Sequence, residues 1–203
     1  MVTRETLETL EALQAQFPLG PDSLDPLTII DRYYPEETER RAILIAHGVD
    51  VATLALELAE AHPELAIDRR FVYEAAMLHD IGIYLTDAEG IDCHGNEPYI
   101  RHGYLGAELL RSLGLPRHAH VAERHTGAGL TMQELRDKGV DLPEGVYMPE
   151  TVEERLICYA DKFYSKTRLG RRKELDKVRL SLLRHGPASL ERFDALASEF
   201  GGG

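Results

Sequence analysis

Residues 75–82 read AAMLHDIG, and this stretch decides the fold that we expect. The apolar spacing predicts a helix over residues 68–79. This helix ends at His79, and the chain leaves the helical path at Asp80-Ile81-Gly82. Adjacent polar side chains at the buried end of an apolar helix must be paired or bound to a ligand, because an unpaired buried charge is costly. The stretch therefore predicts a helical core with a ligand site at one helix end.

Helical spacing of apolar residues continues on both sides of this stretch. Alternation with a period of two residues never exceeds four residues, so we expect no sheet. The sequence therefore predicts an all-α fold, a single bundle of about eight to ten helices. The expected helices cover residues 3–16, 36–62, 68–79, 100–113, 116–124, 131–138, 151–166, 174–184 and 188–200, and Thr151 with Glu154 fits a capping box. A further short helix is expected after the link 21–25, through Ile29, Ile30 and Tyr33.

Composition excludes several classes of protein. The 203 residues carry 23 Lys+Arg and 35 Asp+Glu, a net charge of −12, which argues against a long nucleic-acid partner. We find no apolar run of the roughly 20 residues that span a bilayer, so we expect no membrane contact. Cys93 and Cys158 cannot form a disulfide framework and indicate a reducing, cytoplasmic compartment.

Further histidines and an aspartate stand in apolar surroundings. His47 lies beside the apolar residues 43–46, and Asp161 follows the mostly apolar residues 156–160. A single helical histidine is more often an ordinary core or surface residue than a metal ligand. An isolated buried carboxylate would be costly, however, whereas a metal-bound one would not. The set, with His102 and His125, therefore favours a metal site over separate structural roles.

The order of these residues resembles the HD-domain superfamily of metal-dependent phosphohydrolases. Residues 79–82 show its HDIG form, and the resemblance extends over about residues 42–166. It implies that Asp80 bridges two metals. The implied ligands of the first metal are His47, His79, Asp80 and Asp161, and those of the second are Asp80, His102 and His125.

The resemblance implies a small stand-alone HDIG-type member that hydrolyses a phosphate ester, with a nucleotide as one candidate substrate, by metal-bound hydroxide. Mixed imidazole and carboxylate ligands suit divalent transition metals, with Fe or Mn first and Zn, Ni or Co as alternatives, and Mg²⁺ is a further candidate. A one-metal form, in which His102 and His125 face the substrate, stays open. The single His125 without a GYP element, and the apolar residues after Asp80, argue against cyclic-di-GMP and ppGpp as substrates.

Basic residues near the proposed ligands are candidates for holding the phosphate. Lys162 is assigned to catalysis together with Asp80, and also to substrate binding. For Lys162 and Lys166, a solvated helix end is the competing interpretation. Lys166, Arg101 and Arg124 complete the expected substrate-binding set. The polar loop 89–98 is expected to lie over the entrance of the site.

The chain is expected to form one domain with helical flanks, and two functions other than hydrolysis stay open. We expect an N-terminal helical extension at residues 1–35, the metal-binding domain at 36–170, and C-terminal helices of the same domain at 171–203. A di-iron oxygenase would use the same six ligands, and a non-catalytic sensor would bind metal or nucleotide without turnover. The expected partner is a small phosphorylated substrate, and a homodimer through the flanking helices stays open.

Overall fold

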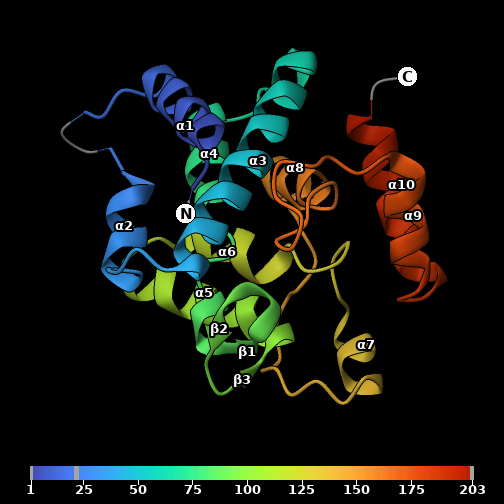
Figure 1. Ribbon diagram of the computed structural model, residues 1–203. Helices are drawn as coiled ribbons and strands as arrows, with labels where there is room; N and C mark the ends of the chain where they lie inside the picture. The colour runs from blue at the N-terminus through green and yellow to red at the C-terminus, as the bar shows by residue number, and fades with distance from the viewer. Residues whose placement is uncertain (1, 21–22, 202–203) are drawn as a thin grey trace.

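The computed structural model describes residues 2–20 and 23–201, and these residues form ten α-helices (Figure 1). The all-α prediction is therefore confirmed. The helices are α1 (Arg4–Gln16), α2 (Pro26–Tyr33), α3 (Glu39–Ala61), α4 (Arg69–Leu78), α5 (His102–Ser112), α6 (Pro116–Arg124), α7 (Met132–Asp137), α8 (Val152–Asp161), α9 (Leu175–Leu183) and α10 (Pro187–Phe200).

Short polar side chains start many of these helices. Thr38 and Asp68 each accept a hydrogen bond from a backbone N–H in the first turn of α3 and α4. Thr151 does the same for α8, but only half of the predicted capping box forms. The Glu154 carboxylate instead accepts from the Glu150 N–H and from Arg124, whereas the complete box forms at the start of α7.

A small sheet, which the sequence analysis did not predict, lies between α4 and α5. Its strands are β1 (Thr86–Ala88), β2 (Cys93–His94) and β3 (Glu97–Pro98), in the order β2-β1-β3. The first pair is antiparallel and the second is parallel. The expectation of no sheet was wrong here because strands of two or three residues are too short to show alternation.

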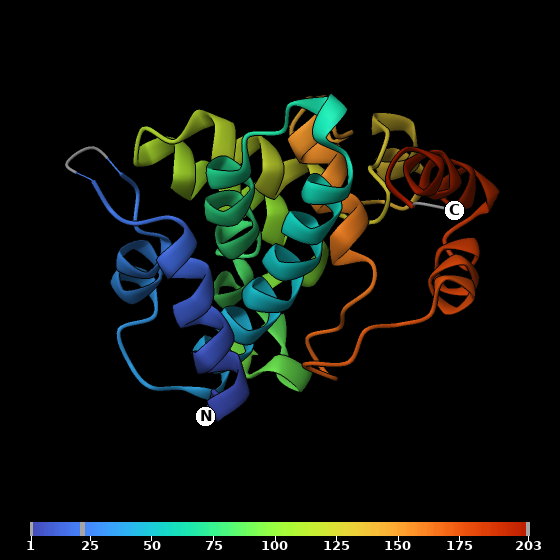
Figure 2. The same ribbon diagram turned by 90° about the horizontal axis from the view of Figure 1, so that it is seen from above.

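Helix α3 forms the centre of the core and packs against α1, α4 and α8. Seen from above, α1 and α2 lie on one side of the molecule and α9 and α10 on the other (Figure 2). Contrary to the sequence expectation, α3 is long and apolar enough to cross a membrane. Most of its apolar window is buried inside the protein, however, which is typical of a core helix.

Helix α8 ends at Asp161, five residues earlier than predicted. Lys173 holds the chain that follows, because its ammonium donates to the carbonyls of Lys162 and Tyr164 at 3.0 and 2.9 Å. Its backbone N–H also donates to the Phe163 carbonyl at 2.7 Å. The early end turns residues 162–166 toward the histidine cluster instead of continuing them along the helix axis.

Candidate metal centre

Five helix segments bring the six predicted ligands together in the interior. His47 lies in the middle of α3, His79 and Asp80 follow the last turn of α4, and Asp161 is the last residue of α8. The remaining two, His102 and His125, lie at the start of α5 and directly after α6. All six side chains are buried, and Asp80 is fully so.

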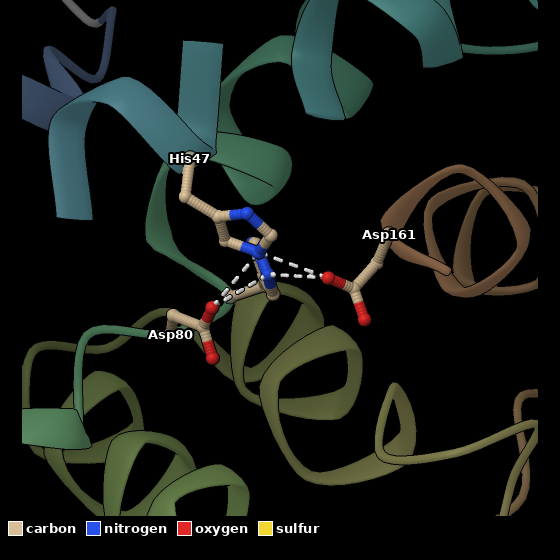
Figure 3. A group of neighbouring side chains, drawn as sticks. His47, Asp80 and Asp161 are labelled. Atoms are coloured by element: carbon tan, nitrogen blue, oxygen red, sulfur yellow. Dashed lines mark hydrogen bonds and ion pairs between the residues drawn. The ribbon is translucent and has the colours of Figure 1, made fainter. Parts of the chain in front are cut away.

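Four of these residues form the first group, part of which is drawn in Figure 3. His47 Nε2 lies 2.9 Å from Asp161 Oδ1 and 3.3 Å from Asp80 Oδ2. His79 Nε2 lies 3.0 Å from the same Asp80 oxygen and 3.6 Å from Asp161 Oδ1. Two imidazole nitrogens and two carboxylate oxygens thus converge on one point.

The second group uses the other oxygen of Asp80. Asp80 Oδ1 lies 3.3 Å from His102 Nε2 and 3.5 Å from His125 Nε2, and these two nitrogens are 3.1 Å apart. Asp80 therefore presents one oxygen to each pair of histidines. This is the arrangement that a carboxylate bridging two cations requires.

Three of the histidines are held by the same local hydrogen bond. In each of them the ring Nδ1 lies 2.7 Å from the backbone carbonyl oxygen of the residue three positions earlier. The pairs are His79 with Ala76, His102 with Tyr99, and His125 with Ala122. A ring nitrogen beside a carbonyl oxygen must carry the proton, so Nε2 is left with a free lone pair in the neutral ring. Such a partner is the usual support of a metal-binding histidine.

The buried polar atoms fit a cation. Asp80 Oδ1 and His79 Nε2 make no hydrogen bond within residues 2–20 and 23–201 although they are fully buried, and the partner of Asp80 Oδ2 is the Lys166 ammonium at 2.6 Å. Buried polar atoms are almost always hydrogen-bonded, and an ionised carboxylate without partners is costly. Since all donor atoms within each group lie within 4.8 Å of one another, a divalent cation in each would satisfy them.

The charges of the cluster suit metal binding. Burial raises the pKa of Asp80, but His79 and Lys166 outweigh it and hold that pKa well below its usual value. Burial lowers the pKa of His79, but the carboxylates of Asp80 and Asp161 outweigh it and raise that pKa to about 9. Burial lowers the pKa of His125 to about 4. The carboxylates are therefore ionised, and a cation would displace a proton from His79.

Two lysines extend into the cluster from the segment after α8. Lys162 Nζ lies 2.5 Å from Asp161 Oδ2 and 3.0 Å from the His125 carbonyl, and Lys166 Nζ lies 2.6 Å from Asp80 Oδ2. Burial lowers the pKa of Lys166, but Asp80 outweighs it and raises that pKa above its usual value, so the amine is charged. Both lysines therefore face the site instead of forming a solvated helix end.

A cavity of about 460 Å³ opens beside His47 and Asp161. Gly90 and Ile91 of the loop 89–98 contribute to its wall, and the expected place of this loop over the entrance stays a prediction. Burial raises the pKa of Tyr99 to about 12, so this phenol is neutral. Besides the lysines, the polar and aromatic side chains around the cavity include Tyr99, Tyr164, Ser165, Thr167, Ser181 and His185.

The structure places Arg101 and Arg124 away from this cavity wall. Arg124 is buried, and its Nη1 donates to Glu150 at 2.7 Å and to Glu154 at 3.0 Å. Arg101 pairs with Glu97 at 3.0 Å. Carboxylates therefore already neutralise both guanidinium groups, and the expected role of Arg101 and Arg124 in substrate binding stays a prediction.

Two residues, Tyr34 and Gly82, position the site, although the sequence assigned neither of them this role. The buried Tyr34 hydroxyl donates to the Ile81 carbonyl at 2.9 Å and accepts from the Tyr84 N–H at 3.2 Å, which fixes the turn after Asp80. A Cβ on Gly82 would lie 2.3 Å from the His102 carbonyl, so only glycine lets the two chain segments approach. A tyrosine far upstream gives no local signal, but the glycine after His79-Asp80 was visible.

Comparison with known proteins gives one family. The model of the HD domain family matches residues 44–165. An uncharacterized protein of Methanocaldococcus jannaschii is 38% identical over 138 residues, which is 66% of this chain and 72% of that protein. No solved structure matches the chain significantly.

Two longer relatives are named tRNA (cytidine(56)-2'-O)-methyltransferase. The protein of Picrophilus torridus is 35% identical over 154 residues, which is 71% of this chain and 40% of that protein. The protein of Thermoplasma volcanium is 32% identical over 146 residues, which is 71% of this chain and 37% of that protein. The chain thus spans about two fifths of the length of these relatives.

Proposed function

The chain belongs to the HD domain family, and from this membership we propose that it is a metal-dependent phosphohydrolase that cleaves a phosphate ester in the cavity beside Asp80. The observation that carries the proposal is the position of Asp80, whose two oxygens face separate pairs of histidines. This arrangement supports two divalent cations for each chain, with Fe or Mn as the first candidates.

The cations would be held by His47, His79, Asp80 and Asp161 in the first group, and by Asp80, His102 and His125 in the second. When bound, such cations lower the pKa of water and neutralise charge on phosphoryl oxygens.

The lysines would hold and orient the phosphate. Lys162 and Lys166 bring two ammonium groups to the boundary between the ligands and the cavity. Bound cations would compete with these ammonium groups for the carboxylates of Asp161 and Asp80. Both lysines could then hydrogen-bond phosphate oxygens, for which charged donors are well suited. Tyr99, which is neutral and lies in the cavity wall, supplies a further hydroxyl donor.

The lysines favour an anionic ligand at this site, as a hydrolase of phosphate esters requires. An oxygenase would use the same six ligands, and oxygen consumption without phosphate release would distinguish it from a hydrolase. A sensor without turnover would bind a phosphate as well, so only the measurement of turnover separates it from a hydrolase. The preference for a phosphate ester therefore depends on Lys162 and Lys166 together with the ligands.

The names of the longer relatives suggest a nucleotide substrate. Those proteins act on tRNA according to their names, and the chain corresponds to about two fifths of them. We assign no methyl transfer to this chain, and propose that its substrate is a nucleotide, either free or within an RNA. The cavity of about 460 Å³ lies within the roughly 300–1,000 Å³ typical of small-molecule sites.

The test combines metal analysis with a screen of turnover. The protein is purified without oxygen, its metal content is determined by elemental analysis, and phosphate release from nucleotides and simple esters is measured with Mn²⁺. About two metals per chain with phosphate release supports the proposal. Two irons with oxygen consumption and no phosphate release would indicate the oxygenase, and bound metal with neither activity would indicate the sensor.

A further inference from the structure

A second, basic groove adjoins the cavity on the side of α9. It has a volume of about 630 Å³ and shares Ser165, Thr167, Lys173 and Ser181 with the cavity wall, so the two hollows are adjacent. No apolar side chain lies among the described residues that line it. The cationic side chains in its wall are Arg168, Arg171, Arg172, Lys173, Lys177 and Arg184, and the one carboxylate there is Glu174.

The charge of this region is opposite to that of the chain. Residues 162–184 contain nine Lys and Arg and two acidic residues, although the whole chain has 23 and 35. The net charge of −12 therefore conceals a local excess of positive charge beside the cavity. The net charge therefore does not exclude a nucleic-acid partner at this face, because binding depends on the local potential.

The cations of the groove are not used to stabilise the fold by ion pairs. Elsewhere arginines pair with carboxylates, for example Arg111 with Glu123 and Arg155 with Glu199. In the groove the Lys173 ammonium donates hydrogen bonds to the backbone carbonyls of Lys162 and Tyr164, which follow α8. The others, which are Arg168, Arg171, Arg172, Lys177 and Arg184, are exposed and have no carboxylate partner within 4.0 Å in the described part of the chain.

We infer that this groove binds the phosphate backbone of a single-stranded nucleic acid and leads one of its phosphate esters into the cavity. The second half of this inference rests on the proposed function. A group of unpaired cations around a polar groove can pair with successive phosphates of a chain lying in it. A duplex does not fit, because the proposed metal ligands are buried below a cavity of nucleotide size.

An anionic membrane surface is the weaker fit to the same charges. Leu180 and Leu183 of α9 are exposed, but neither lines the groove. A bilayer would call for a convex surface with apolar side chains among the cations. The groove is hollow and polar, which suits a chain lying in it.

The first experiment measures binding without turnover. The full chain is titrated into a fluorescein-labelled single-stranded RNA of roughly ten nucleotides, and anisotropy is followed at several salt concentrations. Each contacted phosphate contributes about 0.7 to the slope of log affinity against log salt, so five contacts give a slope of about −3.5. The R171Q/R184Q variant is expected to bind about tenfold more weakly, with a slope about 1.4 less steep.

A matched variant controls for net charge. R32Q/K138Q removes two exposed cations that do not line the groove, and it is expected to bind within about twofold of the unchanged protein. Equal weakening by both variants would overturn the inference, as would an absence of binding at low salt. Equal affinity for an RNA duplex, or binding to phosphatidylserine vesicles but not to RNA, would overturn it too. Equal binding of DNA of the same sequence would support backbone binding without recognition of the sugar.

A second experiment separates this inference from the proposed function. Phosphate release with Mn²⁺ is compared between a terminally phosphorylated RNA and p-nitrophenyl phosphate. R171Q/R184Q is expected to raise KM for the RNA more than KM for the small ester. Groove-dependent RNA binding without any hydrolysis would refute the hydrolase and keep the groove. Hydrolysis of the small ester without RNA binding would refute the groove alone.

Discussion

Replacing Gly82 by alanine is expected to remove the second metal and to destabilise the protein. The new Cβ would lie 2.3 Å from the His102 carbonyl oxygen and 2.4 Å from the Gly106 nitrogen. Both are backbone atoms, so α5 must move away by about 1 Å to restore an ordinary contact. Overpacking of this kind costs about 1–3 kcal/mol, and the cost belongs at the upper end because no flexible side chain can give way.

The same movement displaces a metal ligand. His102 lies on the segment that must shift, and its Nε2 is 3.3 Å from Asp80 Oδ1. Metal–ligand distances tolerate about 0.2 Å, so a shift of about 1 Å should release this histidine. His47 and Asp161 lie on other helices, and we expect the first group to keep its metal.

Elemental analysis and thermal unfolding check this prediction. Gly82→Ala should retain about one metal in place of two, and the Tm should fall by roughly 6–12 °C for a loss of about 3 kcal/mol. Gly145→Ala is the matched control, since Gly145 is exposed and its Cβ would meet only ordinary contacts of 3.5 Å or more with Tyr147. Unchanged metal content and Tm in Gly82→Ala would refute the argument from close approach.

Four further outcomes are expected. Asp80→Ala should lose both metals and all activity, while circular dichroism should show that its helix content is largely kept. His102→Ala should lose only one metal. Full metal content in Asp80→Ala would contradict the bridging role of Asp80. Lys166→Met should raise KM for a phosphate ester roughly 10–100-fold, from about 1.5–3 kcal/mol for a charged hydrogen bond, with metal content unchanged by elemental analysis. Without metal, His79 has a folded-state pKa of about 9, above about 6.5 in the unfolded chain. The protonated His79 therefore contributes at most about 3 kcal/mol to the free energy of unfolding. This contribution is complete below a pH of about 6.5 and is lost as the pH rises through 9. A free energy of unfolding in urea that does not change over this pH range would refute the prediction.

The sequence predicted the helices well because their signals are local. Helix α6 was predicted at its observed bounds, since Pro116 and the end at Arg124 are readable from neighbouring residues. Helix α8 was predicted too long because its end depends on Lys173, which lies 12 residues beyond Asp161. A stop signal that arrives from a distant side chain is not visible in a short window.

The site was predicted as a set of residues but not as an arrangement. Helical spacing and the resemblance brought six ligands together, yet neither shows which oxygen of Asp80 faces which histidine. Arg124 was assigned to the substrate because it precedes His125, but adjacent residues on a helix point about 100° apart. It turns instead toward Glu150 and Glu154.

The hydrogen bond from a histidine ring to the carbonyl three residues earlier ties ligand position to helix length. His79 and His125 directly follow the last residues of α4 and α6, so one residue more in either helix would rotate the imidazole by about 100° and advance it by about 1.5 Å. The connections between the helices carry no such constraint. Insertions and deletions that preserve the centre should therefore fall in the loops, and a designer who wishes to lengthen this protein should do so there.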